Sequence, residues 1–380
     1  MKKFFYLGAL GLILFEIADI YFIMPMPGSQ QMESIGLAYF LYKWRWAIRA
    51  VFGGLMIAGF PAAFKGSKIF SLLLVAAAGA VVYNANFVMA ADAMFRQPEN
   101  LRFAAGAESA VDTGRLVLGV EYGGEAKAYP IQFIGYHHQV FDTVGGKPVI
   151  VTYCTVCRTG RVFEPVVNGK TETFRLVGMD HFNAMFEDKS TKSWWRQVNG
   201  EAIAGKLTGA VLPEMPSSQM VLGRWLRMYP ATRIMQPDPA FAAEYDSLAN
   251  YEAGRRKGAL TRRDTVPWAE KAWVVGVATD REAKAYDWVA LEKERIIYDR
   301  LGSLPIALVL AGDNKSFTVL QRAGEDQRFT LQNDTLFTPD GSYNLVGKSH
   351  DPAIPDLKKL NASQEYWHSW RTFHPATTKY

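Results

Sequence analysis

The sequence contains two cysteines, Cys154 and Cys157, with two residues between them. One β-prone run, 149–153, precedes the pair and another, 162–166, follows it, so the segment between them is expected to join two strands. A Cys-x-x-Cys-x-x-Gly turn can direct both thiolates at one ion while backbone amides point at the sulfurs. We expect Gly160 to supply the positive φ that such a turn needs. One close pair excludes a disulfide framework and indicates a single local site.

Two adjacent histidines, His137 and His138, precede the cysteines by a short interval. Two thiolates supply only half of a tetrahedral ligand set, and neighbouring strands of one sheet can bring residues this far apart together. Imidazole and thiolate ligands together suit zinc, copper and iron. The sequence therefore predicts a metal or redox site on His137, His138, Cys154 and Cys157, with a zinc, copper or iron ion as the candidate cofactor.

Other interpretations of these residues stay open. In an oxidising compartment the two thiols could form a structural disulfide or a redox-active dithiol. No thioredoxin-like βαβ pattern surrounds them, which weakens the thioredoxin version. The cysteines could also be two buried, inert thiols, and the histidines a structural pair bonded within the core.

A second group of polar and aromatic residues follows, and it could position the cysteine and histidine side chains through hydrogen bonds and packing: Asp188, Thr191, Ser193, Trp194 and Gln197. The aspartate and threonine would equally suit a turn-and-cap pair, and the Trp-Trp pair would suit core packing. Although hydrolytic residue types are present, no nucleophile–base arrangement surrounds them. The sequence assigns no catalytic residue and no reaction, and leaves open whether the protein is an enzyme.

The N-terminal region differs sharply in composition from the rest of the chain. The whole sequence is 49% hydrophobic and 21% charged, yet residues 4–90 are mostly apolar with widely spaced charges. Three stretches, 4–22, 48–64 and 69–88, approach the roughly 20 apolar residues that a helix needs to cross a bilayer. The first is too long, and lacks a cleavage site, to be a signal peptide. We therefore expect three transmembrane helices within residues 1–91.

The positive charges around these stretches favour one orientation. Two groups lie on opposite sides of the membrane: Lys2, Lys3, Lys65 and Lys68 on one, and Lys43, Arg45 and Arg49 on the other. The larger group favours an N-terminus inside the cell, so residues 92 onward would lie outside the cytoplasm. Glu16 and Asp19, near the end of the first span, are either functional groups or residues at headgroup level.

The sequence from residue 92 contains an internal repeat. Gly119-Val120, followed by Glu-Ala-Lys-Ala-Tyr at 125–129, recurs 157 residues later as Gly276-Val277, followed by the same pentapeptide at 282–286. Further matches keep the order, ending with Trp225 and Trp370 at a shorter offset of 145 residues. Strand alternation and hairpin signals recur in each copy. We expect a β-rich α+β soluble domain of two tandem degenerate repeats, with helices near 217–228 and 238–256.

The two copies differ in their chemistry. The first repeat, 92–258, carries the Cys/His cluster, whereas the second, degenerate repeat, 259–380, has Glu294-Arg295, Ala311 and Asn314 at the corresponding positions. A duplicated framework with reactive side chains in one copy indicates a site in that copy.

The order of these motifs resembles the bacterial and archaeal family called domain of unknown function 3179. The resemblance covers roughly residues 100–375 and is carried by Gly145–Val149, Val151–Cys157, Phe163, Asp188–Gln197 and Gly200–Gly205. The family often has His-Glu before Asn-Asp, where this chain has His137-His138 and Phe141-Asp142. The resemblance implies an exported or membrane-anchored protein and a site, but no established activity.

Together these features predict a membrane-anchored extracytoplasmic protein of the bacterial inner membrane, with its soluble domain on the periplasmic side and a metal or thiol-redox site in its first repeat. The alternative is a non-catalytic accessory subunit of a larger membrane complex, because Gly53, Gly54, Gly59 and Gly79 suit close helix packing. The expected partners are the lipid bilayer and other membrane-protein subunits. The net charge of +5 is modest and no dense Lys/Arg run occurs, so we expect no nucleic-acid partner.

Overall fold

The computed structural model describes every residue from Met1 to Tyr380. The chain forms two compact units that interleave along the sequence. The first, here the anchor unit, comprises Met1–Arg96, Glu172–Arg196 and Glu201–Val211. The second, here the β unit, comprises Gln97–Thr171, Gln197–Gly200 and Leu212–Tyr380.

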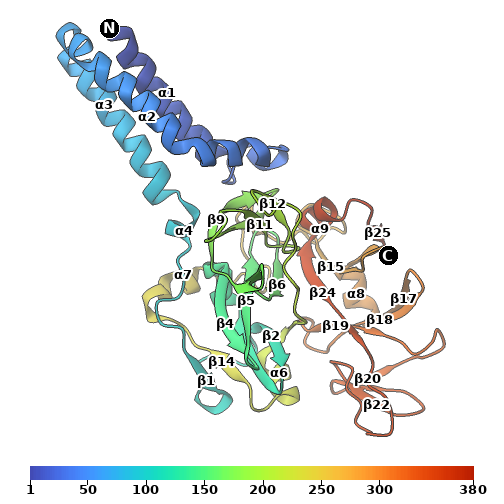
Figure 1. Cartoon of the computed structure of the whole chain (residues 1–380). Helices are drawn as coiled ribbons and strands as arrows, with labels where there is room; N and C mark the ends of the chain where they lie inside the picture. Colours follow the sequence, from blue (N-terminus) through green and yellow to red (C-terminus); the bar gives the residue numbers. More distant parts are fainter. The chain divides into compact units, whose positions relative to one another are not determined.

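Three apolar helices form the N-terminal part of the anchor unit and lie side by side (Figure 1). They are α1 (Lys2–Tyr21), α2 (Ile35–Gly66) and α3 (Lys68–Tyr83), the last continued by a π-helical turn, Asn84–Val88. All three are long and apolar enough to cross a membrane, as expected. The second helix begins at Ile35, well before the predicted residue 48, because Lys43 and Arg45 interrupt an apolar run that starts earlier.

Glycines set how closely α1 and α2 approach. A Cβ added to Gly8 would lie 2.5 Å from both Met56 N and Phe52 O, and one added to Gly59 would lie 2.2 Å from Phe5 N. Only glycine permits this backbone contact, which is a common way for helices to pack in a membrane.

A buried ion pair joins the three helices. Arg49 donates to both carboxylate oxygens of Glu16, at 2.6 and 2.9 Å, and to Asn86 Oδ1 at 2.8 Å. Asn86 Nδ2 in turn donates to Glu16 Oε2 at 2.8 Å. Glu16 is fully buried, and a bidentate guanidinium with an added amide is the kind of pairing that a buried carboxylate requires. Glu16 therefore holds the helices in register.

A four-stranded sheet completes the anchor unit, with the order β12-β11-β10-β9. Its strands are β9 (Phe174–Asp180), β10 (Asn183–Asp188), β11 (Trp194–Arg196) and β12 (Ala202–Ala204). Trp194 is the centre of the contact between this sheet and the first turns of α2, since the rings of Tyr39 and Tyr42 both lie 5.1 Å from it. The aromatic and apolar start of α2 thus packs against the sheet.

The first half of the β unit contains a five-stranded sheet of order β1-β14-β3-β2-β13 and a three-stranded sheet of order β4-β5-β6. The strands are β1 (Phe103–Ala105), β2 (Leu116–Tyr122), β3 (Glu125–Pro130), β4 (Gln139–Val144), β5 (Lys147–Cys154), β6 (Thr159–Phe163), β13 (Ser218–Val221) and β14 (Arg233–Met235). Helix α5 (Ile131–His137) leads from β3 to β4, and α6 (Leu222–Met228) follows β13.

The second half contains the sheets β24-β15-β16-β25 and β17-β18-β19-β23, coloured orange to red in Figure 1. The strands are β15 (Trp273–Ala278), β16 (Ala283–Asp287), β17 (Ile296–Leu301), β18 (Leu304–Leu310), β19 (Phe317–Gln321), β23 (Lys359–Leu360), β24 (Ala362–Tyr366) and β25 (Thr378–Lys379). Helix α8 (Trp288–Glu294) precedes β17 and α9 (Trp367–Phe373) follows β24. A small sheet is added by β20 (Thr330–Gln332), β21 (Thr335–Phe337) and β22 (Ser342–Asn344).

The two halves contain corresponding elements in the same order. Strand β13 pairs antiparallel with β2 as β24 does with β15, and β14 pairs parallel with β3 as β25 does with β16. Each half has an aspartate bound by a lysine and a tyrosine: Lys127, Tyr129 and Asp142 in the first, and Lys284, Tyr286 and Asp299 in the second. Gln219 of β13 donates to Gln364 of β24 at 2.9 Å, so the corresponding strands meet at corresponding residues.

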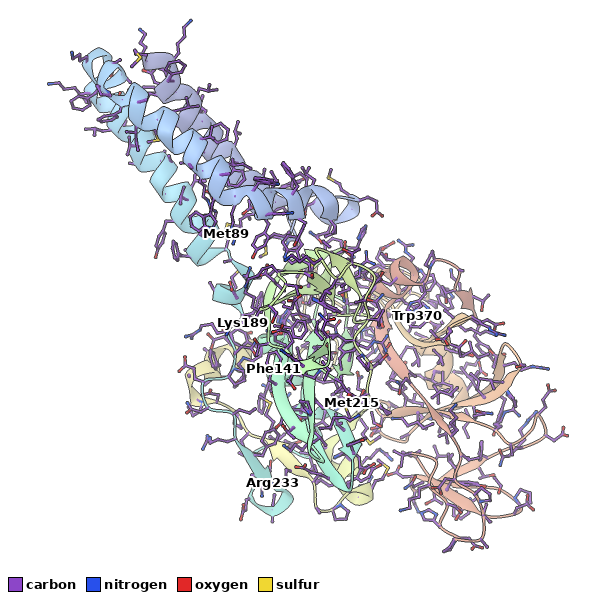
Figure 2. All side chains as sticks on the ribbon, viewed as in Figure 1. Met89, Phe141, Lys189, Met215, Arg233 and Trp370 are labelled. Carbon is purple, nitrogen blue, oxygen red and sulfur yellow. The ribbon has the colours of Figure 1, made fainter.

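The matching glycines and tryptophans also make the same contact in each half. A Cβ on Gly119 would lie 2.5 Å from the Trp225 ring, and one on Gly276 would lie 2.1 Å from the ring of Trp370, which Figure 2 labels. Each glycine therefore makes room for an indole: Trp225 of α6, the helix after β13, in the first half, and Trp370 of α9, the helix after β24, in the second.

The predicted helices of the soluble part are only partly correct. The 238–256 stretch contains a 3₁₀ turn, Pro239–Phe241, and the short helix α7 (Ala242–Ser247), followed by turns. In the 217–228 stretch, residues 218–221 form β13 because they pair with β2, and the helix starts only at Leu222. The soluble part is β-rich with several sheets, as expected.

Candidate functional site

The cysteines lie in the tight turn between β5 and β6. Cys154 pairs with Thr159 at the end of the ladder, and Cys157 lies in the turn between them. The residue with positive φ is Arg158, at 59°, so the expectation for Gly160 is wrong. Gly160 lies in β6, where a Cβ would meet the Tyr153 ring at 3.2 Å. Its role is to make room for close packing.

The two thiols are completely buried and are not joined in a disulfide. Cys154 is close enough to Cys157 to affect its ionisation. Burial raises the pKa of Cys157 well above its ordinary value, and the neighbouring Cys154 adds to this, while the Ser369 hydroxyl and the Lys271 charge act in the opposite direction. Cys157 is therefore a protonated thiol at neutral pH.

A buried lysine lies beside the cysteine turn. Lys271 Nζ donates to the carbonyl oxygen of Val156 at 2.8 Å and is 2.9 Å from His368 Nε2. Burial lowers the pKa of Lys271 to about 8, against the opposing effect of the Cys157 and Cys154 thiols. Burial also lowers the pKa of His368 to about 3, with a further contribution from the Lys271 charge. His368 Nε2 also lies 3.2 Å from the Val156 carbonyl oxygen, so the neutral ring can either accept from the ammonium or donate to that oxygen through Nε2, depending on its tautomer.

The other side of Cys157 leads to a buried carboxylate. Ser369, which lies within hydrogen-bonding reach of Cys157, donates from its hydroxyl to Glu365 Oε2 at 3.0 Å. Glu365 Oε1 accepts from Arg161 at 3.1 Å and from Ser363 at 2.7 Å. A continuous polar chain therefore runs from the thiol to a paired carboxylate inside the protein.

Arg158 fixes the turn to the second half of the β unit. Its guanidinium is 1% exposed, donates to Gln364 Oε1 at 2.8 Å and to the Glu252 carbonyl at 3.0 Å, and lies 3.8 Å from the Trp273 ring. The Tyr366 N–H donates to the Cys157 carbonyl at 2.9 Å. The cysteine turn is therefore held by residues that follow it by 94 positions or more.

The groups from the second half were not found by sequence reasoning: Lys271, Glu365, His368 and Ser369. A signal for two of them exists, because the 145-residue offset puts Gly223 and Arg224 at the positions of His368 and Ser369. Comparing the copies in both directions would have singled these residues out.

The two predicted histidines are both buried and engaged with other partners. His137 Nε2 lies 2.7 Å from the Tyr245 hydroxyl. His138, with φ at 62°, ends α5, and its Nδ1 lies 3.0 Å from the Tyr136 carbonyl. Burial lowers the pKa of His138 to about 4. Nowhere in the chain does a group of three or more His, Cys, Asp or Glu side chains form a set that could hold a metal ion.

The Asp188 group forms a closed turn inside the anchor unit. The two oxygens of Asp188 accept from Thr191 N at 2.5 Å, Thr191 Oγ1 at 2.7 Å and Trp195 Nε1 at 2.9 Å. The Ser193 hydroxyl lies 2.7 Å from Thr191 Oγ1 and accepts from the Leu207 N–H at 3.1 Å. These bonds are those of a turn-and-cap arrangement, and Trp194 packs in the core of the same unit.

Gln197 lies in the β unit, next to the cysteine turn. Its Nε2 donates to Thr152 Oγ1 at 3.0 Å and to the Thr159 carbonyl at 3.1 Å. Since Thr152 belongs to β5 and Thr159 to β6, the amide ties together the two strands that hold Cys154 and Cys157.

A matching turn joins β18 to β19 in the second half. Asp313 Oδ1 accepts from the N–H groups of Lys315 and Ser316, both at 2.8 Å, and Oδ2 accepts from the Ser316 hydroxyl at 2.6 Å. Arg224 of α6 donates to the same carboxylate at 2.5 Å. This turn has a carboxylate where the first has Val156.

Comparison with known proteins gives one match. A family model described as "Protein of unknown function (DUF3179)" matches residues 96–377. No curated protein and no solved structure matches the chain.

Proposed function

Because this chain belongs to the DUF3179 family, whose function is unknown, we propose a function from its own buried chemistry. The protein is a membrane-anchored extracytoplasmic protein in which Cys154 and Cys157 form a thiol–disulfide centre. The observation that carries this proposal is that two free, fully buried thiols lie in one tight turn. A disulfide needs only these two groups, whereas a zinc, copper or iron site would need further ligands.

The reaction is a two-electron exchange with a small disulfide. The sulfurs of Cys154 and Cys157 join, both thiol protons leave, and the acceptor disulfide is reduced to two thiols. Lys271 is suited to take the first proton, because its pKa of about 8 leaves part of it as a neutral amine at mildly alkaline pH. Since both sulfurs are buried, the acceptor must be small and must reach them when the turn opens.

Redox titration of the purified full-length protein tests this proposal. The protein is equilibrated in buffers of graded thiol and disulfide content, and its thiols are alkylated after denaturation and counted by mass spectrometry. We expect a reversible change between two alkylated cysteines and none, with a single midpoint. Thiols that stay fully alkylated at every potential would reject the redox centre. Bound zinc, copper or iron that disappears in Cys154→Ser would support the metal version instead.

The distribution of charges supports the proposed orientation. The rings of Phe5 and Phe60 lie 5.8 Å apart, and those of Tyr6 and Phe70 lie 5.9 Å apart, so the start of α1 is next to the connection between α2 and α3. Four lysines gather at that end: Lys2, Lys3, Lys65 and Lys68. At the other end Glu16 neutralises Arg49. The excess of positive charge at the lysine-rich end is therefore larger than a simple count suggests, and the positive-inside rule favours that end as the cytoplasmic one.

We propose that the lysine-rich end lies in the cytoplasm and the β unit on the periplasmic side of a bacterial inner membrane. Fusions of alkaline phosphatase and of a cytoplasm-dependent fluorescent protein to the C-terminus test this. Active phosphatase without fluorescence is expected, and the reverse pattern would overturn the orientation.

We also propose that the two halves are repeats. The support is that the same strands pair antiparallel in each half, and that Gln219 contacts Gln364. An experimental structure in which β2 to β6 failed to superpose on β15 to β19 would reject it. The predicted repeat boundary near residue 258 stays a prediction.

A second candidate function is that of an accessory subunit. An added Cβ would meet nothing within 4 Å at Gly53, Gly54 or Gly79, so these glycines are open to a neighbouring helix in the membrane. Purification in mild detergent should then return a larger complex, and a lone monomer would speak against this role.

A further inference from the structure

A basic cavity of about 550 Å³ lies within the anchor unit, between the first turns of α2 and the segments that follow β10 and β12. Lys189, labelled in Figure 2, marks the start of the turn after β10. Four cationic side chains line the cavity, and no carboxylate does: Lys43, Arg45, Lys192 and Lys206.

Two of the four cations in this cavity have no carboxylate partner. Neither Lys43 nor Lys206 has a carboxylate within ion-pair distance, whereas Lys192 approaches Glu187 to 3.9 Å. Arg45 donates to the Tyr42 carbonyl at 2.5 Å, lies 3.9 Å from the Tyr42 ring, and lines a neighbouring pocket together with Asp19, on which its charge acts. Cations gathered without counter-charges attract an anion.

The cavity lies at the level expected for lipid headgroups. Helix α2 has 32 residues, which is about 48 Å at 1.5 Å per residue, whereas a hydrocarbon core is about 30 Å thick. The predicted apolar stretch starts at residue 48, and the exposed Trp44 and Trp46 just before it are the residues that favour the membrane–water boundary. Lys43 and Arg45 therefore lie where phosphates of the outer leaflet would be found.

The walls of the cavity are fixed before any ligand binds. The Tyr39 hydroxyl donates to the Lys192 carbonyl at 3.0 Å, which joins α2 to the turn after β10. Gly205 has a φ of 103°, and a Cβ there would lie 2.7 Å from Ser193 and 2.9 Å from the Tyr39 hydroxyl. The cations thus project from a rigid frame, which lowers the entropic cost of binding.

From these observations we propose that the cavity binds the headgroup of an anionic phospholipid, with the phosphodiester among the four cations and the acyl chains along the apolar part of α2. The inference rests on membrane insertion of the helices and is independent of the thiol chemistry. A zwitterionic headgroup is a poorer fit, because its own ammonium would be repelled by the lysines.

Lipid binding to the full-length protein in nanodiscs tests the proposal. Discs contain phosphatidylcholine with or without phosphatidylglycerol, and bound lipid is measured by native mass spectrometry. The test variant is Lys43→Gln with Lys206→Gln. The matched control, Lys170→Gln with Lys348→Gln, removes the same charge from two exposed lysines of the β unit. We expect phosphatidylglycerol affinity to fall roughly fivefold for each lysine removed from the cavity, and to stay unchanged in the control.

Three results would overturn the proposal. One is equal retention of phosphatidylglycerol by the test variant and the control. Another is no preference of the unaltered protein for phosphatidylglycerol over phosphatidylcholine. The third is displacement of the lipid by millimolar inorganic phosphate or glycerophosphate, which would identify a site for a soluble phosphate. The thiol titration is unaffected by any of these outcomes, so the two proposals fail separately.

Discussion

The turn that contains the cysteines and the turn at Asp313 occupy matching places in the two halves of the β unit, yet they are stabilised in opposite ways. The Asp313 carboxylate binds the backbone and side chains of its own turn, and Arg224 from the other half adds one ion pair. The cysteine turn has Val156 at this position. Its carbonyl oxygens are bound from outside by Lys271 and by the Tyr366 N–H.

This difference shows what a carboxylate inside the turn changes. A turn closed by its own carboxylate has a fixed geometry, because the local hydrogen bonds specify it. A turn held from outside can change its internal geometry while its outer contacts remain. Under the proposed thiol–disulfide function, the turn held from outside is the one in which the sulfur–sulfur bond would form.

Removal of Arg158 should give the largest contrast between the two turns. Arg158→Ala removes the buried bonds to Gln364 Oε1 and to the Glu252 carbonyl and leaves a cavity beside Trp273. We expect unfolding free energy to fall by about 3–5 kcal/mol. Lys315→Ala, at the matching position, removes one exposed bond to the Gly114 carbonyl and should change stability by about 0.5 kcal/mol at most. Urea denaturation of both variants measures this, and equal losses would contradict the comparison.

Lys271 should make the free energy of unfolding of the β unit rise in the alkaline range, where the Asp313 turn contributes no such change. Burial lowers its pKa from 10.5 to about 8, so the unfolded chain binds more protons between these values. Stability then rises with pH from about 8 to 10.5, by about 3 kcal/mol at most. Lys271→Met should remove this rise, and the control Lys315→Met, at a half-buried lysine, should keep it. Denaturation curves collected at several pH values would refute the account if both variants behaved alike.

Acid should weaken the Asp313 turn selectively. Burial alone would raise the pKa of Asp313, but hydrogen bonds from Ser316, Lys315 and Arg224 outweigh it and hold the pKa below its ordinary value. The resulting stability is present above the unfolded pKa of about 3.9 and is lost as pH falls through the lower folded value. Asp313→Val should cost about 2 kcal/mol at pH 7 and flatten this acid dependence. Chemical denaturation at pH 3 and pH 7 checks both parts.

The smallest effect is expected at Ser369, which corresponds to Arg224 in the other half. Ser369→Ala removes the hydroxyl that favours the Cys157 thiolate, so alkylation of Cys157 by iodoacetamide should slow by about two- to tenfold and shift to higher pH. Arg224→Ala should leave the alkylation profile unchanged while weakening the Asp313 turn. A profile that moved equally in both variants would show only a general loss of packing.

The membrane helices and the cysteine turn could be predicted from sequence because both are local signals. Apolar runs of about 20 residues directly predict helices long enough to span a membrane. The β-prone runs on either side of Cys154 and Cys157 predict the hairpin. The start of α2 could not be found in this way. Residues 35–47 carry lysine, arginine and tryptophan, and they are helical because Trp194 packs against Tyr39 and Tyr42.

The residues that surround the two thiols could not be predicted from the sequence either, because they come from distant parts of the chain. Lys271 and His368 reach Val156 across 115 and 212 residues, through the meeting of two halves whose arrangement no short pattern encodes. The histidine pair illustrates the converse. His137 and His138 are near the cysteines in sequence, and a backbone bond from Tyr153 to the His138 carbonyl brings the two strands together, yet the ring of His137 binds Tyr245.

The bond from Arg158 to Gln364 spans 206 residues, and this has a consequence for the order of assembly. A hairpin such as β5–β6 can form in microseconds once it is made, but the groups that cover its cysteines are added to the chain much later. At about 5–20 residues per second of synthesis, the thiols stay uncovered for at least ten seconds or so. For the proposed thiol–disulfide centre, this interval would expose both thiols to the redox conditions of the compartment that the growing chain has reached.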